Sequence, residues 1–169
     1  MKRLVLFLLF LLVPYMVARA EPFGFVASGG VWTDDAFETA GGGFLTGFIF
    51  PVDAGRGLYG RTQYHQFNIG DNKPVQSVDV SFLLTYNLGK RYDIFFHVGG
   101  EEYLSGADGT QFIGGFGLDK TIWTVKREGY SVPYTFKVFT DIAFVDNEFE
   151  PTGQHLKAFL GLVFYPSQK

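Results

Sequence analysis

The chain has 169 residues and a formal net charge of −3 at pH 7, from 14 Lys and Arg against 17 Asp and Glu. It contains no cysteine, which excludes disulfides and thiolate metal sites. An acidic chain is not attracted to phosphate backbones, so we expect no nucleic-acid partner. Glycine (22) and phenylalanine (20) are abundant, and glycine, β-branched and aromatic residues share the same segments. This composition indicates an all-β protein.

The first twenty residues have the features of a secretory signal peptide. Residues 1–3 are basic at two of three positions, residues 4–13 are apolar, and residues 18–20 form a small-x-small cleavage site. The apolar run has about ten residues, whereas a membrane-spanning helix needs roughly 20. We therefore predict a signal peptide over 1–20 and a single β-barrel domain over 21–169.

Eight segments of the remaining chain have the length and residue alternation of β-strands. Each has about ten or more residues, the length that a tilted strand needs to cross a bilayer. Short turn-rich connections separate them, so neighbouring strands run antiparallel. Eight antiparallel strands, an even number, suit a closed barrel. We therefore predict an all-β fold, an eight-stranded antiparallel up-and-down transmembrane β-barrel. In chain order the segments are 23–32, 41–50, 58–68, 76–88, 92–103, 111–122, 132–145 and 154–165.

Each strand has two faces, because successive side chains point to opposite sides. The second segment is weakly two-faced, with Phe44 and Phe48 opposed to Leu45, and the third is the least apolar. The fourth, fifth, seventh and eighth segments have one clearly apolar face. These faces comprise Val78, Val80, Phe82, Leu84, Tyr86 and Leu88; Tyr92, Ile94, Phe96 and Val98; Tyr134, Phe136, Val138, Ile142 and Phe144; and Leu156, Ala158, Leu160, Leu162 and Phe164.

The direction of the apolar faces separates two classes of protein. A soluble periplasmic barrel that binds an apolar ligand would turn them inward, where rows of Phe and Leu would overfill a narrow lumen. It would also expose Leu83, Phe95, Phe139, Phe159 and Val163 to water. The opposite facing places the apolar rows in lipid and leaves small and polar residues inside. We therefore predict membrane facing, and keep the soluble barrel as the alternative.

Two further patterns fit membrane facing. Aromatic residues near the strand ends are typical of interfacial girdles. They are Tyr92, Tyr103, Trp123, Tyr134, Phe164 and Tyr165. Glycines inside the strands predict inward positions that make room for large neighbours. They are Gly29, Gly30, Gly41, Gly42, Gly43, Gly99, Gly100, Gly114, Gly115 and Gly117.

With this facing, charged and polar side chains of both signs point into the lumen. A charge there must be paired or hydrated, because an isolated buried charge costs several kcal/mol. We therefore predict a structural polar network, with Arg61 paired to Asp79 and Asp141 paired to Lys157 across neighbouring strands. The network residues are Arg61, His65, Asp79, His97, Glu101, Lys137, Asp141 and Lys157, and Gln63, Asp93 and Asp119 also face inward.

The same residues offer little for catalysis. A triad of Ser105, His97 and Glu101 would need the last two in contact, yet they lie about 13 Å apart along a strand. His65, His97 and His155 lie on three separate segments without metal-ligand spacing. We therefore predict no catalytic, metal-binding or cofactor-binding residues and no cofactor. The sequence favours the interpretation that the protein is not an enzyme. A lipid-modifying outer-membrane enzyme remains the alternative.

In signal peptide, strand count and aromatic final strand, the chain resembles the small OmpA/OmpX-type outer-membrane barrels. The resemblance implies a Gram-negative-type outer membrane and a structural or surface-interaction role. It also implies contacts with outer-membrane lipids and lipopolysaccharide and with the barrel-insertion machinery. Such barrels usually end on an aromatic residue, whereas here residues 166–169 follow Tyr165. Lipid A deacylases of this size carry a His-x-Ser pair, which the chain lacks, so that activity is not carried over.

Overall fold

The computed structural model describes residues 23–34, 40–69, 74–106, 109–130, 133–146 and 155–166. The predicted signal peptide, 1–20, lies outside them. Across the described residues, no helix has the length and apolarity to cross a membrane. The elements are β1 (Gly24–Asp34), β2 (Ala40–Asp53), the 3-10 helix η1 (Ala54–Arg56), β3 (Leu58–Ile69), β4 (Val75–Asn87), β5 (Tyr92–Ser105), β6 (Thr110–Val125), β7 (Tyr134–Asp146) and β8 (His155–Tyr165).

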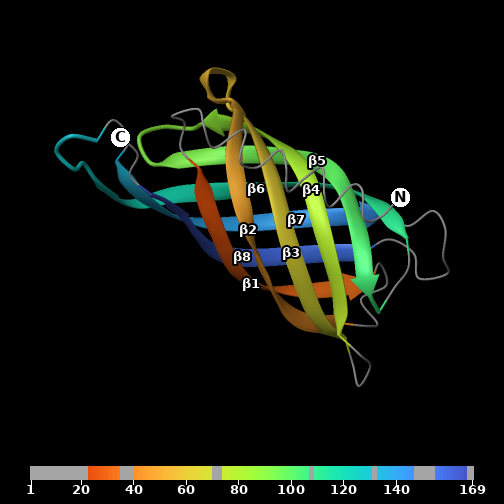
Figure 1. Ribbon diagram of the computed structural model, residues 1–169. Coiled ribbons are helices and arrows are strands. Elements are labelled where there is room, and N and C mark those ends of the chain that lie inside the picture. The colour runs from red at the N-terminus through yellow and green to blue at the C-terminus, as the bar shows by residue number, and fades with distance from the viewer. Residues whose placement is uncertain are drawn as a thin grey trace.

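The strands pair in sequence order and close into one barrel (Figure 1). Every pair is antiparallel, and β8 returns to β1, where Phe25 lies opposite Phe164. Closure gives every strand two hydrogen-bonded neighbours and leaves no free edge. The predicted eight-stranded up-and-down barrel is confirmed. Because the strand number is even, β1 begins at the same end of the barrel at which β8 ends, and we call this the terminal end.

The strand bounds agree with the predicted segments to within three residues. The largest differences are at β2 and β6, which each continue three residues beyond the predicted end. Both strands have a register shift there, between Pro51 and Asp53 in β2 and between Thr121 and Trp123 in β6. A bulge changes the phase of the alternation while the strand continues. The alternation of apolar and polar residues therefore stops at the bulge, which is why the predicted segments end before the strands do.

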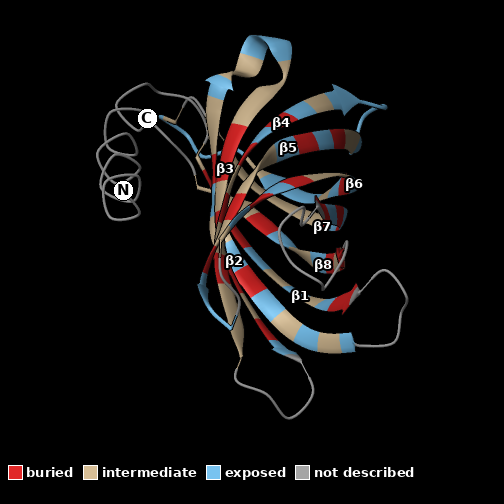
Figure 2. Ribbon diagram, turned by 90° about the vertical axis from the view of Figure 1, so that its right-hand side faces the viewer, coloured by how far each residue is buried: buried red, intermediate tan, exposed pale blue. Residues whose placement is uncertain are grey.

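Burial alternates along the strands, as the bands of colour in Figure 2 show. In β4, Phe82 is 56% exposed and Leu83 is 4% exposed. In β8, Leu160 is 62% exposed and Phe159 is 4% exposed. The predicted outward facing of the apolar rows is confirmed.

The lumen also holds large hydrophobic side chains beside the small and polar residues. They form one buried cluster of Val26, Trp32, Leu45, Ile49, Phe67, Leu83, Phe95, Phe139, Phe159 and Val163. Charged residues therefore share the interior with aromatic rings.

Outward aromatic rings gather near the terminal end of the barrel. The ring centroids of Phe25 and Phe48 are 5.4 Å apart, and those of Phe136 and Phe164 are 4.7 Å apart. The prediction of an outward aromatic girdle is wrong for two of its residues. Tyr103 is only 6% exposed, and Tyr165 lines a cavity inside the barrel. Both fall on the inward phase of their strands, which proximity to a strand end does not reveal.

The strand glycines divide into two groups according to the face they occupy. A Cβ on Gly115 would lie 2.6 Å from Nε2 of His97, and one on Gly117 would overlap the ring of Phe95. These inward glycines make room for large lumen side chains, as predicted. Gly42 faces outward with open space around it, and Gly114 has only ordinary contacts. The prediction is therefore wrong for the outward glycines.

Candidate functional site in the barrel lumen

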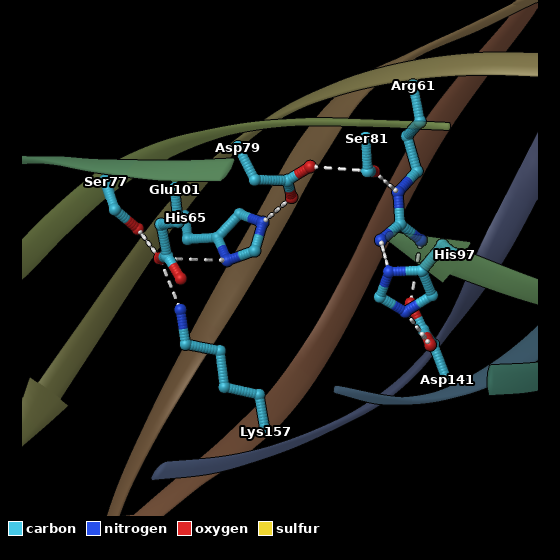
Figure 3. Close-up of polar contacts among 9 residues, drawn as sticks. All are labelled: Arg61, His65, Ser77, Asp79, Ser81, His97, Glu101, Asp141 and Lys157. Atoms are coloured by element: carbon cyan, nitrogen blue, oxygen red, sulfur yellow. Dashed lines mark hydrogen bonds and ion pairs between the residues drawn. The ribbon is translucent and has the colours of Figure 1, made fainter. Parts of the chain in front are cut away.

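The eight predicted polar residues all lie in the lumen, in two separate clusters. Seven of them join Ser77 and Ser81 in one chain of polar contacts across the middle of the barrel (Figure 3). We call this set of nine residues the lumen network. Lys137 belongs to a second cluster nearer the terminal end.

One part of the lumen network is built around the guanidinium of Arg61. Arg61 Nη1 donates to Asp141 Oδ2 at 2.7 Å, and Nε donates to Ser81 Oγ at 3.2 Å. Nη2 lies 3.1 Å from Nδ1 of His97, whose Nε2 lies 3.0 Å from Asp141 Oδ1. Residues of β3, β4, β5 and β7 thus meet at one point. The guanidinium therefore ties opposite walls of the barrel together.

The other part of the network is built around two carboxylates. His65 Nε2 lies 2.7 Å from Asp79 Oδ2, and its Nδ1 lies 3.9 Å from Glu101 Oε1. Glu101 also accepts hydrogen bonds from Ser77 and Lys157. These charged side chains are at most 1% exposed. Charges this deeply buried persist only with close partners, which the geometry provides.

Ser81 connects the two parts. Its hydroxyl accepts from Arg61 and donates to Asp79 Oδ1 at 3.1 Å. Ser77 and Ser81 are absent from the residues predicted for the network. The available signal was their position on the inward phase of the segment 76–88, together with the need of buried carboxylates for extra donors.

Both predicted ion pairs are wrong. Arg61 pairs with Asp141 rather than Asp79, and Lys157 pairs with Glu101 rather than Asp141. In the observed register, Arg61 lies opposite Ser81, and Lys157 lies opposite Ala143. Long side chains in a narrow barrel reach toward its axis, so their partners come from distant strands. The predicted partners were wrong because they were sought only on neighbouring strands.

The contacts also determine the charge balance of the network. A guanidinium has no acceptor, so Nδ1 of His97 accepts from Arg61 and its imidazole is neutral. Arg61 and Lys157 then oppose the three carboxylates Asp79, Glu101 and Asp141. His65 lies between two of these carboxylates, with Nε2 2.7 Å from Asp79 Oδ2 and Nδ1 3.9 Å from Glu101 Oε1.

The second cluster, which we call the mouth cluster, consists of Lys137, Asp93 and Asp119. Lys137 Nζ donates to Asp93 Oδ2 at 2.6 Å and to Asp119 Oδ1 at 2.9 Å. Asn87 Nδ2 donates to the other oxygen of Asp93 at 2.7 Å. The three charged side chains are 12–16% exposed, so solvent reaches them more than the lumen network.

A cavity of about 410 Å³ occupies the lumen between the lumen network and the terminal end. Arg61 and Gln63 lie at its inner end, and the mouth cluster lies along its wall. Apolar side chains cover much of the remaining surface. They are Val26, Ile49, Leu83, Phe95, Phe139 and Val163.

The residues considered for catalysis do not come together. Both ring nitrogens of His97 are engaged, by Arg61 and Asp141, and no nucleophile contacts it among the described residues. Glu101 is held by Ser77 and Lys157. Ser105 is exposed and donates to the backbone oxygen of Pro74. The three residues of the considered triad therefore have separate partners.

Closed pairing, an apolar outer surface and an inward polar network define a small eight-stranded transmembrane β-barrel. No protein-family model matches the sequence, and no curated protein does. The fold is similar to a de novo designed transmembrane β-barrel, with 12% sequence identity and a TM-score of 0.52 over 86% of this chain and 98% of that chain. It is also similar to Ail, the attachment invasion locus protein of Yersinia pestis, solved with the heparin analogue sucrose octasulfate. That match has 10% identity and a TM-score of 0.53 over 86% of this chain and 99% of Ail. The chain thus has the fold of the small outer-membrane barrels.

Proposed function

We propose that this protein is a non-enzymatic barrel of a Gram-negative-type outer membrane, with a lumen closed by polar side chains and a structural or surface-interaction role. The main support is the lumen network. Its charged side chains cross the barrel interior with at most 3% exposure. Conducting channels instead keep a water-filled lumen and use roughly 16–18 strands.

Membrane placement is supported by the outer surface. Val31, Phe82, Phe112 and Leu160 are each more than half exposed, and they lie on β1, β4, β6 and β8. Exposed apolar surface on this scale is costly in water and favourable in lipid. The partners that we propose are outer-membrane lipids and lipopolysaccharide, together with the machinery that inserts barrels. The alternative of a soluble periplasmic barrel would leave this surface in water.

The absence of catalytic activity is supported by the way the histidines are used. His97 contacts Asp141, which is paired with Arg61, and His65 contacts Asp79, which also accepts a hydrogen bond from Ser81. A general base needs a nucleophile within hydrogen-bond reach, and neither imidazole has one among the described residues. A lipid-modifying enzyme would need such a pair facing the lipid.

Cell fractionation tests the placement. We expect the protein in the outer-membrane fraction, with migration on a gel that changes on heating. Substituting Leu160→Lys should destabilise the folded barrel by about 2–4 kcal/mol, because a charge at the lipid-facing midplane is unfavourable. The matched control is Lys120→Leu on the outer face, which adds no charge to lipid. Recovery in the soluble periplasm, with Leu160→Lys neutral, would favour the soluble barrel.

Planar-bilayer recordings test closure of the lumen. The purified protein should show no steady conductance, whereas a trimeric porin in the same bilayers should conduct. A steady, reproducible conductance of the unmodified protein would contradict a closed lumen. Mass spectrometry of lipid A from cells with and without the gene tests the enzymatic alternative, and an altered lipid A profile would contradict a non-enzymatic role.

A further inference from the structure

The cavity in the terminal half of the lumen has the size and lining of a small-molecule site. Its volume of about 410 Å³ lies within the range of roughly 300–1,000 Å³ that is typical of ligand pockets. The rings of Phe95, Phe139, Tyr59 and Tyr165 are part of its wall. Aromatic faces of this kind accept flat apolar bodies and attract cations.

The charge on the cavity wall has a definite sign. Asp93 and Asp119 carry two negative charges, and Lys137, which binds both, carries one positive charge. Arg61 also lines the cavity, but Asp141 balances its charge at 2.7 Å. The wall therefore has one net negative charge in a site where the mouth-cluster side chains are only 12–16% exposed. A cation entering the cavity would compensate it, because charge pairs strengthen away from water.

A second feature at the inner end of the cavity is independent of this charge. Gln63 lines the cavity and is 2% exposed. Both its side-chain nitrogen and its oxygen are buried without a hydrogen-bond partner in the part of the chain that the structure describes. A buried amide in this state costs free energy until a partner satisfies it. A polar atom of a bound molecule would supply that partner.

We infer that the cavity binds a small organic cation with a flat apolar body. The cationic head pairs with Asp119 and Asp93, the body lies among the aromatic rings, and a polar atom at its far end bonds with Gln63. Entry is from the terminal end, where exposed Asn87 and the turn residue Gly57 line the cavity. The mouth cluster and the amide together favour a cation over a neutral or anionic molecule of the same shape.

Three indole compounds of one shape and different charge test the inference. Tryptamine is a cation, tryptophol is its neutral analogue, and indole-3-acetate is an anion. Binding is measured by equilibrium dialysis against the purified protein in phosphatidylcholine nanodiscs, with empty nanodiscs as the background. Tryptamine should bind saturably at one site, tryptophol about tenfold more weakly and indole-3-acetate more weakly still. Equal binding of all three, or no saturable binding above the background, would overturn the inference.

Two pairs of variants locate the site. Asp119→Asn should abolish the preference for tryptamine over tryptophol, whereas Glu102→Gln, on the outer face of β5, should retain it. Gln63→Leu should weaken the binding of tryptamine about tenfold. It should leave the binding of 1-methyltryptamine unchanged, because this compound lacks the indole N–H that would bond with Gln63. Gln111→Leu, at a buried inward position outside the cavity lining, is the control.

Each variant is first checked for the heat-dependent gel migration of a folded barrel. If Asp119→Asn does not fold, Lys137→Met provides the opposite test, since removing the cation should tighten tryptamine binding. Unchanged selectivity in Asp119→Asn, or weaker tryptamine binding in folded Lys137→Met, would contradict the proposed site. Equal losses in Gln63→Leu and Gln111→Leu would likewise contradict it.

Discussion

The two halves of the lumen are built from the same eight strands, but they differ in how their charged side chains are paired and buried. Near the middle, Arg61 and Lys157 extend across the barrel to carboxylates on distant strands, and aromatic rings fill the space around them. Toward the terminal end, the inward side chains leave a cavity, and the mouth cluster on its wall contacts solvent. The same barrel therefore has one half with a filled lumen and one half that keeps a cavity.

The largest expected effect is from removing a cation in the lumen network. Lys157→Met leaves Glu101 without its ammonium partner, which should lower the free energy of unfolding by about 3–5 kcal/mol. Urea unfolding in lipid vesicles measures it. Adding Glu101→Gln to the same chain removes the unpaired charge and should recover a large part of the loss. A loss under 1 kcal/mol for Lys157→Met would show that water already reaches Glu101.

Thiol accessibility should distinguish the two halves directly, since the chain has no native cysteine. Val163→Cys places a thiol in the cavity wall, whereas Ala143→Cys places one in the filled half, at a residue that is 1% exposed. A small water-soluble methanethiosulfonate should react with the former roughly 100-fold faster, because the latter must await local opening. Similar rates would remove the distinction between the halves.

Packing in the filled half predicts a smaller effect. Gly115→Ala brings a methyl group against the His97 imidazole and the β7 backbone, and should destabilise the barrel by about 1–3 kcal/mol. Its neighbour Gly114 faces outward with ordinary contacts, so Gly114→Ala is the matched control and should be nearly neutral. Both are measured by the same urea unfolding. Equal losses would indicate a backbone effect rather than packing around His97.

The smallest effect is expected at the mouth cluster. Lys137→Met removes the partner of Asp93 and Asp119, yet these side chains are 12–16% exposed and water can reach them. We expect a loss of about 1 kcal/mol, well below that of Lys157→Met. Unfolding of the two variants under identical conditions gives the ratio. A loss as large as that of Lys157→Met would mean that the cavity half is as dry as the network half.

Much of the fold was predictable because it depends on local alternation. In β4, β5, β7 and β8, the alternation of apolar and polar residues predicted which face points outward. Leu83 and Phe159, on the opposite face, are buried in the lumen as this prediction requires. The pattern failed at the bulges, where the phase changes within a strand. It also failed for Tyr103, because a position near a strand end does not identify the face.

The membership of the polar network was largely predictable, but its pairing was not. Inward phase identified Arg61, Asp141 and Lys157. Their partners depended on the strand register and on how far each side chain reaches across a narrow lumen, and neither quantity is encoded locally. Ser81, which joins the two parts, is an ordinary small residue until the register places it opposite Arg61.

The sequence by itself determined the strand number, the antiparallel order and the outward direction of the apolar rows, because each depends on residues close together in the chain. Only the tertiary structure decided which charges meet, where the lumen is filled and where the cavity remains. Those properties depend on closure, which brings residues as distant as Arg61 and Asp141 within 2.7 Å. They also depend on the match between side-chain length and barrel width, which no single strand carries.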